Sequence, residues 1–332
     1  MNNMSDLTEL RLMKKVAHLY YEMDATQQEI AAKLNLSRPK VSRLLKQARE
    51  TGIVRISIAD AIESCSDLSS TLRAYFNLKE AVVVPTSAYI PDMFRQVVGK
   101  AAATYLNQTL QSRMSIGISW GITLYETVKA MAPLKLSQVH VVQLMGGLGQ
   151  TSPVLQSLEL AKQLAELTGG TCHMLHAPAI TGSAEARDAI TLERSISQVL
   201  DLARTIDLAV VGFDALWRHT SLVQVEGLGP QELSALDRAK AVGECCFHFY
   251  GITGETALPE LDRRTIAIEL DELKDVPNVV GVATGLDTTE AILGGLNLGV
   301  LDVLITDEIS AEKIIMLEDD RRENIVRERA AE

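Results

Sequence analysis

Glycine, serine and threonine residues cluster directly after several short apolar runs, and these clusters are the first candidates for chemistry. They read GISWGIT (117–123), QLMGGLGQTS (143–152), GFDAL (212–216) and GVATGLDTTEA (281–291). Glycine at the end of a strand lets the backbone approach a ligand closely, and the amides that open a following helix favour anions. A single loop of this kind is as readily explained as a tight strand–helix turn. Four of them at one edge of a sheet favour a site for a small polar or phosphorylated ligand.

The acidic residues and histidines form no recognisable catalytic or metal-binding motif. None of the six histidines lies in an HExxH pattern or an evident triad, and HMLH (173–176) falls at the end of an expected strand. Glu244 follows Gly243 and can accept hydrogen bonds from sugar hydroxyls, although a solvated loop carboxylate fits the spacing equally well. ITDE (305–308) is interpreted as a helix N-cap. The sequence predicts no catalytic residue, no metal site and no cofactor.

Residues 26–52, TQQEIAAKLNLSRPKVSRLLKQARETG, carry the chemistry of DNA recognition. Thr26 can cap a first helix, with Glu29 at the capping-box position. Asn35 suits a tight turn, and Ser37 can cap a second helix. This pattern predicts a helix-turn-helix whose second helix enters the major groove, while a solvated basic helix in a small bundle is the alternative. The predicted DNA-binding residues are Thr26, Gln27, Arg38, Lys40, Ser42, Arg43 and Lys46.

The elements that must position the glycine-rich loops alternate along the rest of the chain. Apolar, β-branched runs lie at 81–85, 114–118, 139–144, 171–175, 207–213, 265–269, 279–283 and 302–306. Helix-length stretches between them include 93–110, 157–170, 185–204 and 288–299, with Gly169 and Gly299 as expected C-caps. Strand–helix alternation predicts a mainly parallel, doubly wound sheet, in which ligands bind at the carboxyl ends of strands near a topological switch point.

Length and charge divide the chain into two parts. Its 332 residues suggest about two domains. Residues 1–60 hold 10 Lys and Arg against 7 Asp and Glu, a balance of +3, whereas the whole chain carries −11. We expect a DNA-binding domain over 1–60, a connecting helix over 61–80 with Asp67 as its N-cap, and an effector-binding and oligomerisation domain over 81–332. ETGIVRISI (50–58) is the expected wing strand, where Arg55 contacts a phosphate or remains a surface charge.

The cellular compartment is predicted from what the sequence lacks. Cys65, Cys172, Cys245 and Cys246 show no ligand spacing, which is typical of reduced thiols. The first residues have no apolar signal-peptide core, and no apolar run is long enough to span a membrane. A cytoplasmic protein with no membrane partner is expected, associated with the nucleoid when it is bound to its operator.

In this order, the motifs of the chain resemble the SorC family of bacterial transcriptional regulators. The resemblance rests on residues 26–56, SIGISWGITL, VVQLMGGLG, the segment from SPVLQSLELAKQLAELTGG to HAPAI, DLAVVGF, GECCFHFY and VVGVATGLDTTEAILGGLNLGVLDVLITDE. It implies a winged helix-turn-helix joined to a Rossmann-like effector domain similar to sugar-phosphate isomerases. It also implies a homo-oligomer, often a tetramer, that binds operator DNA and a carbohydrate effector.

The resemblance also implies ligand contacts, to which the loops above add Asp214 and Glu244. The predicted effector-binding residues are Gly117, Ser119, Trp120, Gly121, Thr123, Gln143, Gly146, Gly147, Asp214, Glu244, Gly285 and Thr288. Two departures concern the last loop and the block after AVG. Thr284 stands at a glycine and Thr288 at a lysine that holds a phosphate in many members, and Glu244 replaces an aspartate. An uncharged sugar alcohol therefore becomes a serious effector candidate beside a sugar phosphate, which backbone amides and threonine hydroxyls can still bind.

The combined pattern favours a ligand-responsive transcriptional regulator, a repressor in the commoner case, of a carbohydrate or polyol operon. The alternative is a sugar-phosphate isomerase or deaminase with an appended DNA-binding domain, because fold does not fix function. A structural nucleoid protein fits poorly with the net charge of −11.

Overall fold

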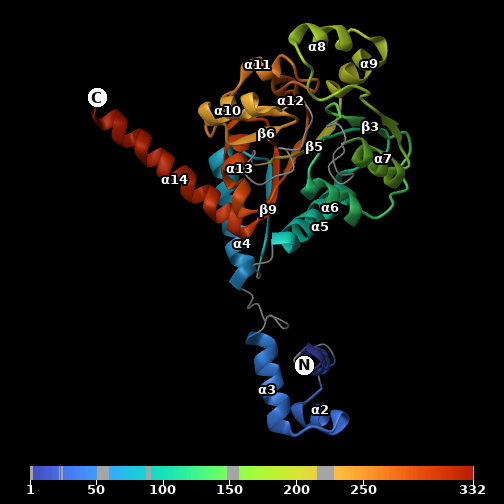
Figure 1. The fold of residues 1–332 in the computed structure, drawn as a ribbon, viewed down its shortest axis with the longest axis vertical. Helices are drawn as coiled ribbons and strands as arrows, with labels where there is room; N and C mark the ends of the chain where they lie inside the picture. Colours follow the sequence, from blue (N-terminus) through green and yellow to red (C-terminus); the bar gives the residue numbers. More distant parts are fainter. Residues whose placement is uncertain are drawn as a thin grey trace. The chain divides into compact units, whose positions relative to one another are not determined.

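The computed structural model describes residues 3–21, 23, 25–50, 60–86, 91–147, 157–214 and 228–331. The chain forms two compact units, Met1–Ala61 and Ile62–Glu332. Figure 1 colours them along the sequence.

The described part of the first unit consists of α1 (Asn3–Tyr21), α2 (Gln27–Leu34) and α3 (Arg38–Glu50). The three helices share a small apolar core to which α2 contributes Ile30 and α3 contributes Val41. Both side chains are fully buried, as expected for the inward stripe of an amphipathic helix. The first unit therefore has its own hydrophobic core.

The predicted caps of the helix-turn-helix are confirmed. The Thr26 hydroxyl accepts from the amide of Glu29, whose carboxylate accepts from the Thr26 amide at 2.8 Å, which completes a capping box. Asn35 adopts the left-handed conformation with φ of 52°, and the Ser37 hydroxyl accepts from an amide in the first turn of α3. The expected wing strand and Arg55 lie outside the described residues.

The second unit is built on a seven-stranded sheet in which every neighbouring pair is parallel. The strands run in the order β1-β9-β8-β5-β2-β3-β4. From β2 the chain proceeds outwards through β3 to β4, then returns to β5 on the other side of β2. The carboxyl ends of β2 and β5 therefore form the topological switch point. The strands are β1 (Glu80–Val84), β2 (Ser115–Ile118), β3 (His140–Gln143), β4 (Thr171–His173), β5 (Leu208–Gly212), β8 (Val279–Val282) and β9 (Val303–Asp307).

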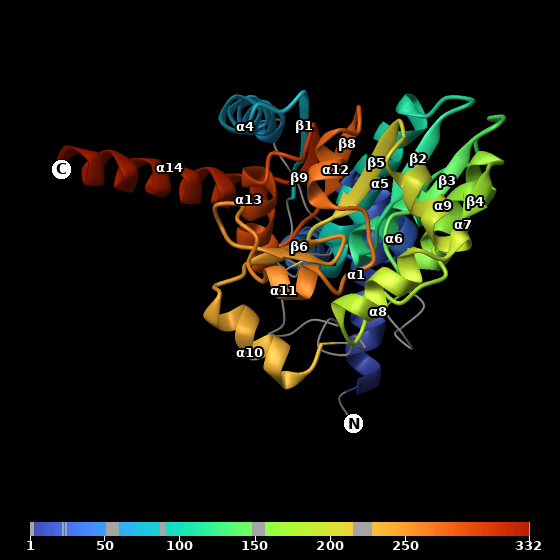
Figure 2. The ribbon, with the colours of Figure 1, turned by 90° about the horizontal axis from the view of Figure 1, so that it is seen from above.

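Helices cover both faces of the sheet, so the predicted doubly wound architecture is confirmed (Figures 1 and 2). The alternation in β5 shows the two layers, because Leu208 and Val210 join one apolar cluster and Ala209 and Val211 join the other. The first cluster packs under α5 (Pro91–Thr109), α6 (Ile122–Ala130) and α7 (Ser157–Thr168). The second packs under α4 (Asp60–Phe76), α9 (Arg194–Ala203), α13 (Thr289–Asn297) and α14 (Glu308–Ala331).

A group of short elements lies outside the sheet. It includes the antiparallel hairpin of β6 and β7, whose turn residues Cys246 and Phe247 both have positive φ. The hairpin was not predicted as strands. The short elements are α8 (Ala184–Thr191), α10 (Pro230–Arg238), β6 (Gly243–Cys245), β7 (His248–Tyr250), α11 (Pro259–Asp262), α12 (Leu270–Lys274) and η3 (Leu286–Thr288).

Three local predictions are wrong. Residues 265–269 form isolated bridges rather than a strand. Their backbone makes hydrogen bonds to residues 144–146 on one side and to residues 179–181 on the other, but each pairing is a single bridge and does not extend into a ladder. Asp67 lies inside α4 rather than at its N-cap, since the polar stretch before it is already helical. The stretch 185–204 is two helices, α8 and α9, rather than one.

The remaining predicted strands match β1, β2, β3, β4, β5, β8 and β9, and Gly169 and Gly299 have the positive φ expected of C-caps. Among the described residues, no helix is both long enough and apolar enough to cross a bilayer.

Candidate functional site

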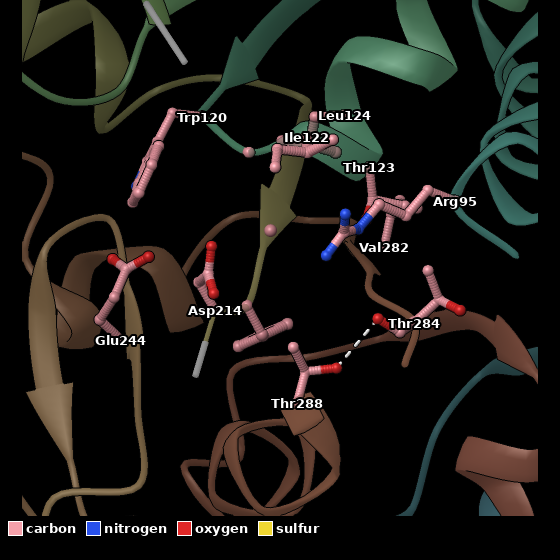
Figure 3. Close-up of a pocket in the computed structure, with 13 residues that line it drawn as sticks. Arg95, Trp120, Ile122, Thr123, Leu124, Asp214, Glu244, Val282, Thr284 and Thr288 are labelled. Atoms are coloured by element: carbon pink, nitrogen blue, oxygen red, sulfur yellow. Dashed lines mark hydrogen bonds between the residues drawn. The ribbon is translucent and has the colours of Figure 1, made fainter. Parts of the chain in front are cut away.

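A pocket opens at the switch point, beyond the carboxyl ends of β2 and β5 (Figure 3). Its walls come from the loops after β2, β5 and β8, from β6 and from the start of α5. They enclose about 410 Å³ of space, part of it open to solvent. Six of the residues predicted for effector binding line it, namely Trp120, Gly121, Thr123, Asp214, Glu244 and Thr288.

The loop after β2 forms one wall. Trp120 is 2% exposed, and among the described residues its indole nitrogen makes no hydrogen bond of normal geometry, although it lies close enough to the Glu244 carboxyl to lower the pKa of that group. Gly121 has a φ of +139°, a conformation that side chains with a Cβ rarely adopt, and it turns the chain directly into α6. Thr123 follows in the first turn of α6, where backbone amides have no helical acceptor. This wall offers an indole donor at one end and helix amides at the other.

Two carboxylates form the acidic side of the pocket. The Glu244 amide donates to the Asp214 carbonyl at 3.3 Å, which brings the β6 hairpin to the end of β5. The Glu244 side chain is 1% exposed, and one of its oxygens accepts from the amide of Phe247 at 2.8 Å. Burial raises the pKa of the Glu244 carboxyl to about 8, and the charge of Asp214 adds to this rise. Glu244 can therefore both donate and accept hydrogen bonds near neutral pH.

Arg95 contributes a cation that the sequence analysis missed. It lies near the start of α5, and its guanidinium points into the pocket on the side of Thr123 (Figure 3). A signal for it was present in the sequence. Val98 and Ala102 follow Arg95 at helical spacing and are fully buried, so Arg95 lies on the inward side of α5.

The loop after β8 closes the pocket below. The Thr288 hydroxyl donates to the carbonyls of Thr284 and Gly285 at 3.0 and 2.8 Å, which tightens the loop into η3. Gly285 has a φ of +113° and its amide donates to the Asp307 carboxylate. Asp307 also accepts from the Ser310 amide, as expected of the predicted N-cap in 305–308. The loop is therefore held by the start of α14.

Three other predicted effector residues lie behind the pocket walls rather than in its lining. A Cβ on Gly117 would approach side-chain atoms of Ile206 and Leu144 to 2.5 Å, so its place is in the packing of β2. The Ser119 hydroxyl accepts from the amide of Gly212 at 3.1 Å and thereby joins the ends of β2 and β5. Gln143 is buried and spans from the Met145 carbonyl to the Leu175 amide.

Gly146 and Gly147 also support the loop backbone instead of lining the pocket. A Cβ on Gly146 would meet the backbone of Pro178 at 2.5 Å, and Gly147 exchanges backbone hydrogen bonds of 2.8 Å with Ala177 and Ala179. Residues 148–152 and 215–216 of the glycine-rich loops lie outside the described residues.

Histidines and cysteines form no metal site in the described part of the chain, where no three metal-binding side chains converge. His173 instead bonds to His140 with 2.9 Å between ring nitrogens, and both desolvation and His140 lower the pKa of His173.

The helix-turn-helix presents a second candidate interface. On α3 the buried residues Val41, Leu44 and Leu45 occupy one side, and the remaining surface is basic. Gln27 at the start of α2 is half-buried, and the hydroxyl of Thr26 is engaged in the capping box. The exposed members of the predicted set are Thr26, Arg38, Lys40, Ser42, Arg43 and Lys46.

Comparisons with known protein families match both units. The profile of the sugar-binding domain family covers residues 60–316, and that of sigma-70 region 4 covers residues 12–51. The deoxyribonucleoside regulator of Bacillus subtilis is 31% identical, over 93% of this chain and 99% of its own length. The sorbitol operon regulator of Klebsiella pneumoniae is 28% identical, over 94% of this chain and the whole of its own length.

Solved structures agree with these relatives. The crystal structure of the full-length sorbitol operon regulator SorC from Klebsiella pneumoniae matches with a TM-score of 0.71 and 28% identity, over 92% of this chain and 98% of that one. A DeoR family transcriptional regulator from Listeria monocytogenes matches with a TM-score of 0.70 and 27% identity, over 76% of this chain and 99% of that one. The resemblance drawn from the sequence motifs is confirmed.

Proposed function

The chain belongs to the SorC family of sugar-binding transcriptional regulators, and we propose that it represses a carbohydrate or polyol catabolism operon until a small effector occupies the pocket. It is a DNA-binding transcriptional regulator with a sugar-binding domain. The sign of regulation, the effector and the operon are the proposed parts.

The observation that carries the effector proposal is the set of polar groups gathered at the switch point. Asp214 and Glu244 offer carboxyl oxygens to hydroxyl groups, and the buried Trp120 indole beside Glu244 offers a donor that makes no hydrogen bond of normal geometry among the described residues. A carbohydrate or polyol presents several hydroxyls that both donate and accept, so it can satisfy all three groups together. A buried donor left unpaired costs free energy, and a ligand that pairs it recovers that cost.

DNA recognition is proposed for the exposed face of α3. Arg43 and Lys46 lie on this face, and Arg can pair with guanine through two hydrogen bonds while Lys contacts phosphates. Gln27 and Thr26 lie at the start of α2, from which the backbone of DNA is commonly contacted. The acidic balance of the rest of the chain disfavours DNA contact elsewhere.

The effector acts on DNA binding only if it binds two arrangements of the protein with different affinity. We expect a cytoplasmic homotetramer, nucleoid-associated when bound, because several recognition helices bound together raise the effective concentration at the operator. Effector binding then favours arrangements whose recognition helices do not match the operator spacing. Light scattering of the full chain, with and without effector, measures the assembly.

The pocket is proposed as a sensor rather than a catalytic centre. Its buried carboxyl, Glu244, is held by the Phe247 amide, and the relatives above are regulators. Incubation of the protein with sugar phosphates, followed by product analysis, checks this. Turnover that E244Q abolishes would instead support an isomerase or deaminase.

The test of the function combines DNA selection with ligand titration. Full-length protein selects its operator from a random duplex library, and its affinity for that duplex is measured with matched pairs of sugars, polyols and their phosphates. We expect one ligand to weaken operator binding at least tenfold without weakening binding to a scrambled duplex. Failure to select any sequence would contradict the regulator, and selection without a ligand response would contradict the effector.

A further inference from the structure

The β6–β7 hairpin carries one side chain of the pocket and one buried histidine. Glu244 lies on β6 and lines the pocket (Figure 3), whereas His248 begins β7 on the other side of the turn and is 2% exposed. In the hairpin Cys245 pairs with His248, and Glu244 pairs with Phe249. His248 and Glu244 are therefore held by neighbouring residue pairs of the same hairpin.

Both ring nitrogens of His248 face hydrogen-bond acceptors. Nε2 lies 3.1 Å from the carbonyl oxygen of Ile268, and Nδ1 lies 3.3 Å from Oδ1 of the Asp262 carboxylate. A neutral imidazole has a single N–H, so either tautomer would turn a lone pair towards one of these oxygens. Only the doubly protonated ring donates to both. The geometry therefore places an additional proton on His248, opposite Asp262.

Asp262 depends on this proton, because its Oδ1 atom is buried and has no hydrogen-bond partner of normal geometry among the described residues. The ion pair with His248 is therefore what compensates the burial of this oxygen. Glu269, whose carboxylate lies 3.9 Å from Nε2, differs because Arg187 of α8 pairs with it at 2.8 Å.

The other charges around His248 balance one another. Lys274 pairs with Asp271 at 2.8 Å within α12, and Arg187 is shared between Glu269 and the exposed Asp188. The titratable and charged groups that face His248 or pair with its partners are Cys245 of β6, Arg187 and Asp188 of α8, Asp262 of α11, Glu269 before α12, and Asp271 and Lys274 of α12.

The turn of the hairpin needs support from outside. Cys246 and Phe247 have φ values of 51° and 66°, a region that residues with a Cβ adopt at a cost in free energy. Such a backbone persists only where surrounding contacts hold it. Tyr250 fixes the base of the hairpin, since its hydroxyl donates to a carbonyl of α13 at 2.9 Å. At the turn, Glu244 accepts from the Phe247 amide at 2.8 Å, and the next residue, His248, makes the ion pair.

From these contacts we propose that the His248–Asp262 ion pair is a pH-dependent switch on the hairpin. While the imidazole holds its additional proton, the ion pair keeps the turn, and with it Glu244, in place at the pocket. When that proton leaves, Asp262 faces a lone pair and the hairpin loosens. The inference rests on the proposed function in treating the pocket as the effector site, and it adds regulation of that site by pH.

Solvent access and charge set the direction of the switch. A cavity of about 480 Å³, part of it open to solvent, is lined by His248, Asp262 and Glu269, so protons can reach the ring. Desolvation lowers the pKa of His248, but Asp262 and Glu269 outweigh it and raise the pKa above its ordinary value of 6.5. The stabilisation is therefore complete below the ordinary pKa and is lost as pH rises through the raised pKa.

The test follows hydrogen exchange of the hairpin in the full chain without any ligand. Mass spectrometry measures the exchange of residues 243–250 between about pH 6 and pH 9, relative to the exchange of an unstructured peptide at the same pH. NMR of isotope-labelled histidine follows the charge of His248. The variants are H248Q and D262N. The controls are H176Q, at an exposed histidine that does not line the cavity, and E244Q, which removes the titration of the pocket carboxyl.

We expect the protection of the hairpin in wild type to fall by at least about tenfold across this range, because one linked proton changes an equilibrium by up to tenfold per pH unit. The fall should follow the loss of charge at His248 and should persist in H176Q and E244Q. D262N should abolish it, since an amide can donate to a neutral imidazole or accept from a charged one. H248Q should abolish it because glutamine does not titrate.

Three results overturn the proposal. They are a His248 that is neutral throughout the range, a protection that stays constant while His248 loses its charge, and a fall that E244Q abolishes but D262N retains. Thermal unfolding checks that each variant is folded, and if H248Q does not fold, D262N decides. Failure of the proposed function looks different. In that case no sugar or polyol would alter operator binding, while the exchange of the hairpin would still depend on pH through His248.

Discussion

The carboxylate of Asp307, at the end of β9, accepts a 2.6 Å hydrogen bond from the hydroxyl of Thr284, which follows β8. The same oxygen accepts from the amide of Gly285, and Ser310 donates its amide and its hydroxyl to the two carboxylate oxygens. Thr284 lines the pocket, so a buried carboxylate outside the lining positions one of its walls.

Replacing Asp307 with Asn should loosen that wall. An amide of the same shape lacks one acceptor oxygen and brings two donors to a place where Thr284 and Gly285 already donate. We expect D307N to lower the unfolding free energy by about 1–3 kcal/mol and to weaken effector binding. Urea unfolding measures the first effect. D275N, at an exposed position after α12, is the control, and an equal loss in both variants would contradict this role.

The stability of the protein should depend on Glu244 between about pH 5 and pH 8. Burial raises the pKa of this carboxyl from 4.5 to about 8, so the folded state holds a proton that the unfolded state releases. The stabilisation is complete below pH 4.5 and is lost as pH rises through the folded pKa. The unfolding free energy should therefore fall by about 1 kcal/mol per pH unit across this window.

E244Q isolates this dependence, because glutamine does not titrate. His248 contributes in the same direction, since Asp262 and Glu269 outweigh its desolvation and raise its pKa, so wild type and E244Q must be compared directly. Urea unfolding at several pH values gives the unfolding free energy as a function of pH, and this free energy should fall less steeply with pH in E244Q than in wild type. An equal dependence on pH in both proteins would show that Glu244 is not protonated in the folded state.

A methyl group at Gly121 should disturb the pocket without any steric clash. Among the described residues, no atom outside the two chain neighbours of Gly121 lies within 4 Å of the place where a Cβ would stand, but the φ of +139° is strained for alanine. We expect G121A to cost about 1–3 kcal/mol of stability or to shift the start of α6. G182A is the matched control, with equally open space and no positive φ. Thermal unfolding distinguishes them, and similar melting temperatures would remove the backbone argument.

Operator binding should depend on Arg43, which is exposed on α3. R43A should weaken binding to the selected operator by about tenfold, in the range of a lost base or phosphate contact, and leave effector affinity unchanged. K162A removes an exposed charge from α7 and should change neither operator binding nor effector affinity. Anisotropy titrations at two salt concentrations separate the cases, because a lost phosphate contact lowers the salt dependence. An unchanged operator affinity would move recognition to other residues of α3.

The periodic features of the sequence predicted most of the fold. Apolar β-branched runs located the strands of the sheet, and the capping pattern around Thr26 located the helix-turn-helix. The β6–β7 hairpin escaped prediction because its turn uses Cys246 and Phe247 in a conformation usually taken by glycine or asparagine. Residues 265–269 were mistaken for a strand because burial, rather than sheet pairing, accounts for their apolar pattern.

The sequence predicts the loops of the candidate site and its two carboxylates, but not its cation. Motif positions after β2, β5 and β8 named Trp120, Asp214 and Thr288, which the structure brings together. Arg95 precedes these motifs; its helical spacing to Val98 and Ala102 indicates the inward side of α5, but only the packing of α5 against the sheet brings that side to the pocket. The sequence indicates only a helix N-cap at Asp307. Its hydrogen bond to Thr284 could not be predicted, because the pairing of β8 with β9 is what brings the two residues close.

The walls of the pocket come from widely separated segments, beginning with Arg95 and ending with the loop at Thr288 that Asp307 holds. The helix-turn-helix, by contrast, precedes all of them and has its own core. During synthesis, the DNA-binding unit therefore leaves the ribosome before any wall of the pocket has formed. A nonsense mutation between α3 and β8 would therefore leave a fragment that contains the core of the DNA-binding unit but lacks walls of the pocket, so its binding to DNA could not respond to a ligand of that pocket.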